Sequence, residues 1–283
     1  MRRLDTAVAS VILFLLVASC APAQQLVQAP REDGASTPLR VYTPSNDGCA
    51  PQALISPGAG GNENGYQYLA EGMQANGWRA IVIGHKESGG SALRSDMRDV
   101  GGVKKGLDEL VNDPKPYNAR LIDIAAALKW AANSCKAPFV ALLGHSMGAR
   151  TVMVEAGAKN NFGIKGPDRF DAYVALSPDG PGKMFPENAW SGIQKPVLML
   201  TGTRDKSLDG DWKSRTIPYQ SLPAGCKWLG VIEGASHLNF AGVGFAGSTE
   251  KLVLLETKAF LNSLRTGKCG TPVQADGITM HSK

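Results

Sequence analysis

Short apolar runs alternate along the chain with stretches of helical periodicity. Runs rich in Val, Ile, Leu and Ala predict buried strands at residues 39–43, 52–56, 78–84, 139–143, 171–176, 197–200 and 228–232. Between and after them, apolar residues at helical spacing or helix-like segments predict helices near 65–75, 103–111, 121–131, 148–157, 211–222 and 252–264. This alternation is typical of a mostly parallel β-sheet with helices on both faces, so we expect an α/β fold.

The first twenty residues are typical of an export signal. Two arginines precede an apolar stretch at 7–18, which is shorter than the roughly 20 residues a membrane-spanning helix needs. Residues 17–20, Val-Ala-Ser-Cys, are similar to a bacterial lipobox, which would make Cys20 a lipidated N-terminus. Residues 21–23, Ala-Pro-Ala, offer an ordinary cleavage site instead. Both routes predict export.

The remaining chain divides into a linker at 21–37, one domain at 38–269 and a loose polar tail at 270–283. We expect a lipoprotein on the periplasmic face of a bacterial membrane, or a soluble periplasmic or secreted protein. Only a lipid anchor would attach it to a membrane. The sequence leaves the oligomeric state open.

Composition narrows the function classes. With 43% hydrophobic and 19% charged residues, the chain is typical of globular proteins. The net charge of +5 is spread along the sequence without a basic stripe, so nucleic acid is not an expected partner.

Apart from Cys20, four cysteines remain: Cys49, Cys135, Cys226 and Cys269. In an oxidising compartment an even set indicates two disulfides, for which three pairings are possible, with free thiols as the alternative. None lies in a C-x-x-C motif or beside a histidine, so we expect no metal site.

The sharpest motif is Gly-His-Ser-Met-Gly at 144–148, directly after a predicted strand and opening a predicted helix. A G-x-S-x-G motif in that setting is a nucleophile elbow, in which a tight turn presents the serine. This motif predicts Ser146 as a nucleophile.

Two further residues complete a catalytic triad in the expected order. Asp205 follows the strand at 197–200, and His237 follows the strand at 228–232. A positioned imidazole removes the serine proton, and a carboxylate orients that imidazole. Asp209 and Asp211 lie on the same loop as Asp205 and are its rivals.

An oxyanion hole is predicted from two backbone N–H groups. One belongs to Met147, after the nucleophile, and the other to Ala59 or Gly60 in the loop Pro-Gly-Ala-Gly-Gly at 57–61. This loop also begins like a dinucleotide fingerprint, but Glu63 stands where the third glycine belongs.

These motifs together resemble the α/β-hydrolase superfamily over residues 38–265, close to its dienelactone-hydrolase-like, chlorophyllase and polyesterase/cutinase branch. The matching segments are 57–61, 144–148, 202–205 and 234–237. The resemblance implies carboxylic-ester hydrolysis through an acyl-enzyme, without a cofactor. Dienelactone hydrolases carry a cysteine nucleophile, so their lactone specificity does not transfer to Ser146. The connection between the strands at 171–176 and 197–200 is too short for a large lid, which favours small esters or short to medium acyl chains.

The resemblance also implies a cysteine pairing. Cys49 and Cys135 each precede one of two strands that are neighbours in this fold, while Cys226 precedes the last strand and Cys269 follows the last helix. The implied disulfides are therefore Cys49–Cys135 and Cys226–Cys269.

Four residues are candidates for the substrate pocket. His85 ends a strand on the carboxyl side, where ligands of open α/β sheets bind. Met184, Phe185 and Trp190 lie in the short connection and either line an acyl pocket or pack the core.

The preferred hypothesis is a serine carboxylic-ester hydrolase acting on a small-molecule ester. Its alternatives are a peptidase or amidase with the same triad and a non-catalytic binding lipoprotein on a hydrolase scaffold.

Overall fold

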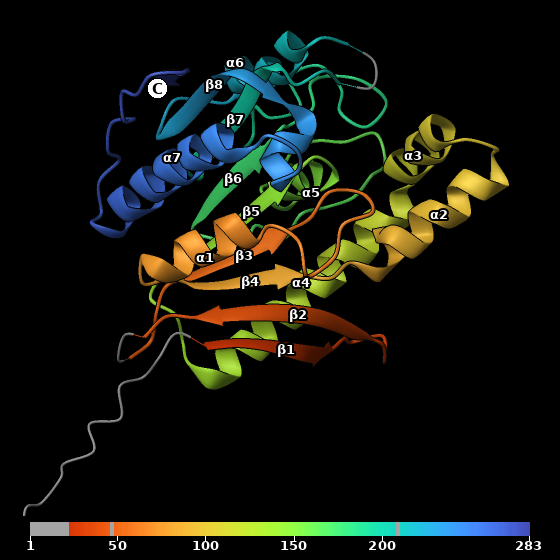
Figure 1. Cartoon of the computed structure of the whole chain (residues 1–283), viewed down its shortest axis with the longest axis horizontal. Helices are drawn as coiled ribbons and strands as arrows, with labels where there is room; N and C mark the ends of the chain where they lie inside the picture. Colours follow the sequence, from red (N-terminus) through yellow and green to blue (C-terminus); the bar gives the residue numbers. More distant parts are fainter. Residues whose placement is uncertain (1–22, 46–47, 208–209) are drawn as a thin grey trace, which may run out of the picture.

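The computed structural model describes residues 23–45, 48–207 and 210–283. The predicted signal peptide at 1–20, with Cys20, lies outside these residues. The described chain forms one nine-stranded sheet with strand order β1-β2-β4-β3-β5-β6-β7-β8-β9 (Figure 1). The strands are β1 Ala23–Pro30, β2 Ser36–Thr43, β3 Gln52–Ser56, β4 Arg79–Ile83, β5 Val140–His145, β6 Ala172–Leu176, β7 Val197–Arg204, β8 Lys227–Ser236 and β9 Ile278–Ser282.

The six strands from β4 to β8 in this order are parallel, and the strands at both edges are antiparallel. All seven strands predicted from apolar runs are present, and the mostly parallel α/β architecture is confirmed.

Helices cover both faces of the sheet because successive strand residues point to opposite sides. Leu54 of β3 packs toward α4 (Pro114–Ser134) and α5 (Met147–Glu155), while its neighbours Ala53 and Ile55 pack toward α1 (Gln67–Ala75) and α7 (Gly247–Arg265). Two hydrophobic cores result, one on each face.

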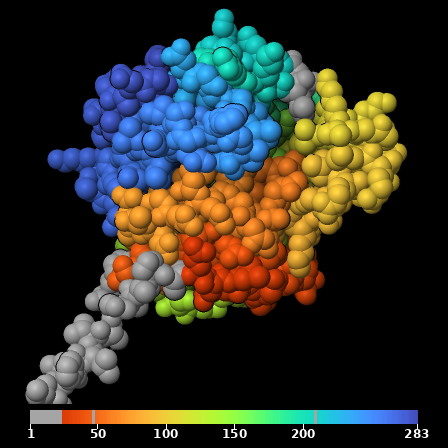
Figure 2. Space-filling view, viewed as in Figure 1, coloured from red at the N-terminus to blue at the C-terminus, as the bar shows by residue number. Residues whose placement is uncertain are grey.

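The remaining helices follow β4, β7 and β8 in the chain. They are η1 Lys86–Ser88, α2 Gly90–Asp99, α3 Val103–Asn112, η2 Trp212–Thr216, α6 Ile217–Ser221 and η3 His237–Ala241. Figure 2 shows α2 and α3, in yellow, projecting from one side of the body. Among the helices in the described part of the chain, none is long and apolar enough to cross a membrane.

Two boundary predictions are wrong. The linker predicted at 21–37 contains β1, which pairs with β2 over its whole length, and Ala29 of β1 is fully buried. The tail predicted at 270–283 contains β9, whose Ile278 and Met280 pack against the core beside β8. In both segments polar composition concealed a strand that needs only one apolar face at a sheet edge.

The structure places the cysteines in two pairs at disulfide distance. Cys49 pairs with Cys135, with Cα atoms 5.7 Å apart, and Cys226 pairs with Cys269, with Cα atoms 5.5 Å apart. Both separations fall in the range that disulfides require.

Candidate active site

Ser146 sits on the sharp turn between β5 and α5. It adopts φ 55° and ψ −118°, a strained conformation for a residue with a Cβ. A Cβ on Gly144 would lie 2.3 Å from the Gly148 carbonyl oxygen, and a Cβ on Gly148 would lie 1.9 Å from the Ser56 carbonyl oxygen. Both glycines of the motif are therefore required by packing, and the turn leaves Ser146 at the carboxyl end of the parallel strands.

His237 connects Ser146 to Asp205. Its Nε2 lies 2.9 Å from Ser146 Oγ, and its Nδ1 lies 2.8 Å from Asp205 Oδ1. Asp205 is fully buried after β7, and its Oδ2 accepts a hydrogen bond of 2.9 Å from Thr201. The rival Asp211 instead caps η2 by accepting from the Lys213 N–H, and Asp209 lies outside the described residues. The arrangement has the distances that proton transfer from a serine hydroxyl requires.

The loop after β3 lies against Ser146. A Cβ on Gly58 would be 3.3 Å from the Ser146 Cβ. Gly60 donates its N–H to the Ser88 carbonyl at 2.8 Å, so that group is already engaged and Gly60 is a poor oxyanion donor. Among the hydrogen bonds of the described residues, the N–H groups of Ala59 and Met147 have no acceptor. These two N–H groups remain available to an oxyanion.

The fold of the chain is similar to that of several solved structures. Est1E from Butyrivibrio proteoclasticus is 16% identical, with a TM-score of 0.60 over 86% of this chain and 99% of its own. A putative dienelactone hydrolase from Klebsiella pneumoniae is 18% identical, with a TM-score of 0.59 over 83% and 97%. The esterase Pf2001 from Pyrococcus furiosus is 15% identical, with a TM-score of 0.57 over 88% and 95%. The chain has the α/β-hydrolase fold. No protein-family model matches the chain, and no curated protein does.

A small cleft opens at Ser146. It has a volume of about 140 Å³. Leu107 and Val111 of α3 give it an apolar wall, while Arg150 and Asp179 form a polar one. A second hollow, about 830 Å³ between α6 and β8, is not lined by Ser146, Asp205 or His237.

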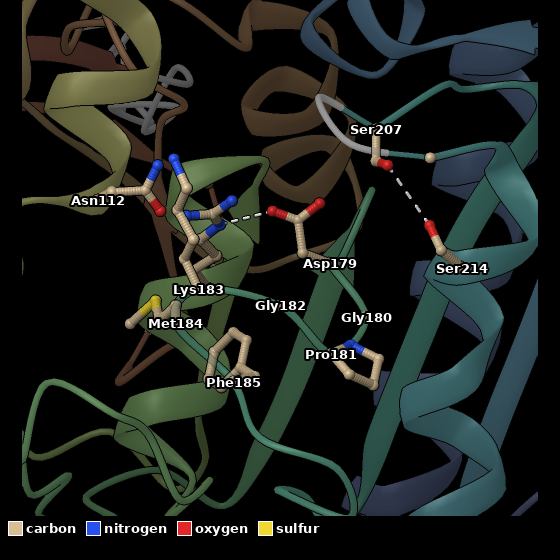
Figure 3. Close-up of a pocket in the computed structure, with 12 residues that line it drawn as sticks. Asn112, Asp179, Gly180, Pro181, Gly182, Lys183, Met184, Phe185, Ser207 and Ser214 are labelled. Carbon is tan, nitrogen blue, oxygen red and sulfur yellow. Dashed lines mark hydrogen bonds and ion pairs between the residues drawn. The ribbon is translucent and has the colours of Figure 1, made fainter.

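The four residues predicted for the substrate pocket do not line one common pocket. Met184 and Phe185 line a hollow of about 80 Å³ that shares Arg150 and Asp179 with the Ser146 cleft, and Figure 3 shows both side chains among those that line it. Trp190 is fully buried, with its ring tilted against that of Phe185, so of its two predicted roles the structure favours core packing.

His85 is not a substrate contact either. It is 2% exposed, and both ring nitrogens are engaged, Nε2 with Ser56 Oγ at 2.9 Å and Nδ1 with Asp123 Oδ2 at 2.8 Å. The strand end correctly places His85 near the site, but η1 and α4 cover the side chain.

A buried arginine that the motifs did not indicate lies against Asp205. Arg215 is 3% exposed, and its Nε lies 3.0 Å from Asp205 Oδ1. Its Nη1 donates to Asp179 Oδ1 at 2.7 Å, and Asp179 also pairs with Arg150. Burial alone would raise the pKa of Asp179, but the positive charges of Arg150 and Arg215 outweigh it and lower this pKa below its usual value. The carboxylate of Asp179 is therefore held ionised between two arginines.

His145, next to Ser146, forms hydrogen bonds to other protein groups through both ring nitrogens. Its Nε2 lies 3.0 Å from the His237 carbonyl oxygen, which only accepts, so Nε2 carries a proton. Burial, with the nearby His237 next, lowers the pKa of His145 well below its usual value, so the ring is neutral and Nδ1 accepts from the Tyr66 hydroxyl at 2.8 Å. Tyr66 in turn accepts the Gly58 N–H at 3.0 Å. This chain of hydrogen bonds ties the loop at 57–61 to the backbone of His237.

Within the described residues, no group of three or more His, Cys, Asp or Glu side chains is placed to bind a metal ion.

Proposed function

We propose that this protein is a serine hydrolase of carboxylic esters. The observation that carries the proposal is the continuous hydrogen-bonded arrangement of Ser146, His237 and Asp205, with separations of 2.9 Å and 2.8 Å. The α/β-hydrolase fold and the esterases among its structural neighbours support it.

The chemistry follows from the positions of these groups. His237 Nε2 accepts the proton of Ser146 as Oγ attacks the ester carbonyl, and Asp205 stabilises the resulting imidazolium. The negative charge that develops on the carbonyl oxygen is met by the N–H groups of Met147 and Ala59. The imidazolium then protonates the leaving alcohol. Water, activated by the same histidine, releases the acid and regenerates Ser146.

The cleft supports small substrates. Its volume of about 140 Å³ is below the roughly 300–1,000 Å³ of typical drug-sized ligand pockets. The apolar wall of Leu107 and Val111 suits a short acyl chain, and the opposite wall of Arg150 and Asp179 suits a polar group. We therefore propose esters of short to medium acyl chains as substrates.

Hydrolysis of p-nitrophenyl esters from acetate to palmitate tests the proposal. Wild-type protein is expected to prefer the short esters, and Ser146→Ala is expected to lose activity by about 10³-fold or more. Ser263→Ala is the matched control, because that hydroxyl bonds only the Phe260 carbonyl in α7. Turnover of amino-acid anilides without ester turnover would instead support the amidase alternative.

We also propose that the chain is exported, because two cysteine pairs at disulfide distance fit an oxidising compartment. Mass analysis of the mature N-terminus after bacterial expression distinguishes the two export routes. A diacylglyceryl adduct on Cys20 supports the lipoprotein, and an unmodified N-terminus beyond Cys20 supports ordinary cleavage.

A further inference from the structure

A second buried polar network, separate from the triad, lies beneath the loop at 57–61. Its centre is Arg120 of α4, which is 1% exposed. Its guanidinium donates to the carbonyl oxygens of Pro57 at 2.8 Å and Gly58 at 3.4 Å, and to the hydroxyls of Ser56 at 3.1 Å and Ser88 at 2.8 Å. Among its acceptors in the described chain, none is a carboxylate. A buried charge is costly without a carboxylate in contact, so this arrangement calls for an explanation beyond stability.

The planarity of the peptide bond connects Arg120 to the oxyanion hole. In a trans peptide, the C=O of one residue and the N–H of the next point in opposite directions. Arg120 holds the Pro57 carbonyl, while Tyr66 holds the Gly58 N–H on the other side of the same peptide. Arg120 also contacts the Gly58 carbonyl, which directs the Ala59 N–H away from the guanidinium. A positive charge on the carbonyl side further polarises the peptide and strengthens its N–H as a donor.

The guanidinium is itself fixed by a relay of buried side chains. Because Ser56 Oγ accepts from Arg120, its hydroxyl proton is directed at His85 Nε2, and His85 Nδ1 then donates to Asp123. Asp123 completes the relay by accepting from Arg31 at 3.1 Å and from Thr37. Ser56, His85 and Asp123 thus have the order of a catalytic triad, but they are buried and fully engaged with protein groups.

We infer that Arg120 is a positioning residue for the oxyanion hole: by holding the Pro57 and Gly58 carbonyls it aims the Ala59 N–H at the reacting carbonyl oxygen. This inference rests on the proposed function. It assigns a task to the buried relay of Ser56, His85 and Asp123, which holds Arg120 in place.

The test is Arg120→Lys, which keeps the charge but cannot hold two carbonyls in a planar fork. For p-nitrophenyl acetate we expect kcat to fall by about 10- to 100-fold with KM changed by less than about threefold, since the lost interaction belongs to the transition state. The inhibition constant of a boronic acid, whose tetrahedral adduct places an oxygen in the oxyanion hole, should weaken in parallel. The matched control is Arg169→Met, which removes a partly buried arginine that pairs with Glu155 and donates to the Leu121 carbonyl, without a hydrogen bond to residues 57–61 in the described chain. It should lower thermal stability but leave kcat unchanged.

The outcomes separate this inference from the proposed function. If wild type is active and Arg120→Lys leaves kcat and the boronic-acid inhibition constant unchanged, the inference alone is overturned. A folded wild-type protein that hydrolyses no ester overturns both. If Arg120→Lys does not fold, Ser88→Ala decides, since it removes only the acceptor of Arg120 Nε. We then expect a fall in kcat of about three- to tenfold with KM preserved, and an unchanged kcat overturns the inference.

Discussion

The carbonyl oxygen of Ser56 fills the space where a side chain on Gly148 would be. An alanine Cβ there would lie 1.9 Å from that oxygen. Because both groups belong to backbone, neither can move aside cheaply, and we predict that Gly148→Ala lowers the free energy of unfolding by about 3 kcal/mol or more. Urea denaturation measures this change.

Gly192→Ala is the control for that variant, because nothing lies within 4 Å of its added Cβ. We expect it to change stability by less than about 0.5 kcal/mol. Equal stability of the two variants would contradict the packing described for the nucleophile turn.

The buried His85 makes stability depend on pH. Burial, with the positive charge of Arg120 next, lowers the pKa of His85 to about 4. An unfolded chain, in which a histidine has a pKa of about 6.5, therefore binds the proton more readily than the folded protein between these values. The contribution of His85 to the free energy of unfolding is therefore largest above pH 6.5. It decreases as the pH falls, by about 2 kcal/mol between pH 7 and pH 5.

Urea denaturation of wild type and His85→Gln at pH 7 and pH 5 isolates that contribution. We predict that the free energy of unfolding falls by about 2 kcal/mol less in the variant than in wild type between pH 7 and pH 5, because the variant has no group to titrate at this position. An equal change in the free energy of unfolding of both proteins would show that His85 is not buried as a neutral ring.

The residues that carry motifs could be predicted from sequence, and their buried partners could not. Ser146, Asp205 and His237 were predicted from a turn motif and from strand ends, and the structure brings them within hydrogen-bonding distance. Arg120 and Arg215 lie on segments without any local motif. Their contacts exist only because tertiary packing brings distant segments to the same loops.

Among the elements, α3 forms the apolar wall of the cleft at Ser146. Leu107 and Val111 of this helix line the cleft, whereas Val103 on the same helix is 64% exposed. We predict that Leu107→Ala enlarges the cleft and raises kcat/KM for the hexanoate ester relative to the acetate ester by about tenfold, as removal of a few methylenes allows. Val103→Ala is the matched control and should leave the ratio unchanged. An unchanged ratio in Leu107→Ala would show that the acyl chain lies elsewhere.

Elements with an apolar face were predictable, and those at the margins were not. The central strands are fully buried and their apolar runs are continuous. By contrast, α2 (Gly90–Asp99) has no fully buried residue, and its contact with the core is made by the partly buried Ala92 and Leu93, so its apolar signal is short. The edge strands β1 and β9 each bury one side only. In β9 the alternation of Ile278 and Met280 was the available signal.

For the molecule as a whole, the Cys226–Cys269 pair ties the end of α7 to the start of β8. This pair closes a loop with a sequence separation of 43 residues. A crosslink over that length restricts the unfolded chain by about 4 kcal/mol in the loop-entropy estimate. We predict that replacing both cysteines by serine lowers the free energy of unfolding by about that amount. Thermal and urea denaturation of the oxidised proteins check this, and unchanged stability would contradict a disulfide here.

The proposed function requires Ser146 to be an activated nucleophile. Intact-mass analysis after treatment with a fluorophosphonate tests this requirement, because stable phosphonylation of a serine needs the activation proposed for His237 and Asp205. We predict one adduct on folded wild-type protein, located at Ser146, and no adduct on Ser146→Ala. Folded wild-type protein without an adduct, or an adduct that persists in Ser146→Ala, would contradict the assignment of Ser146 as the nucleophile.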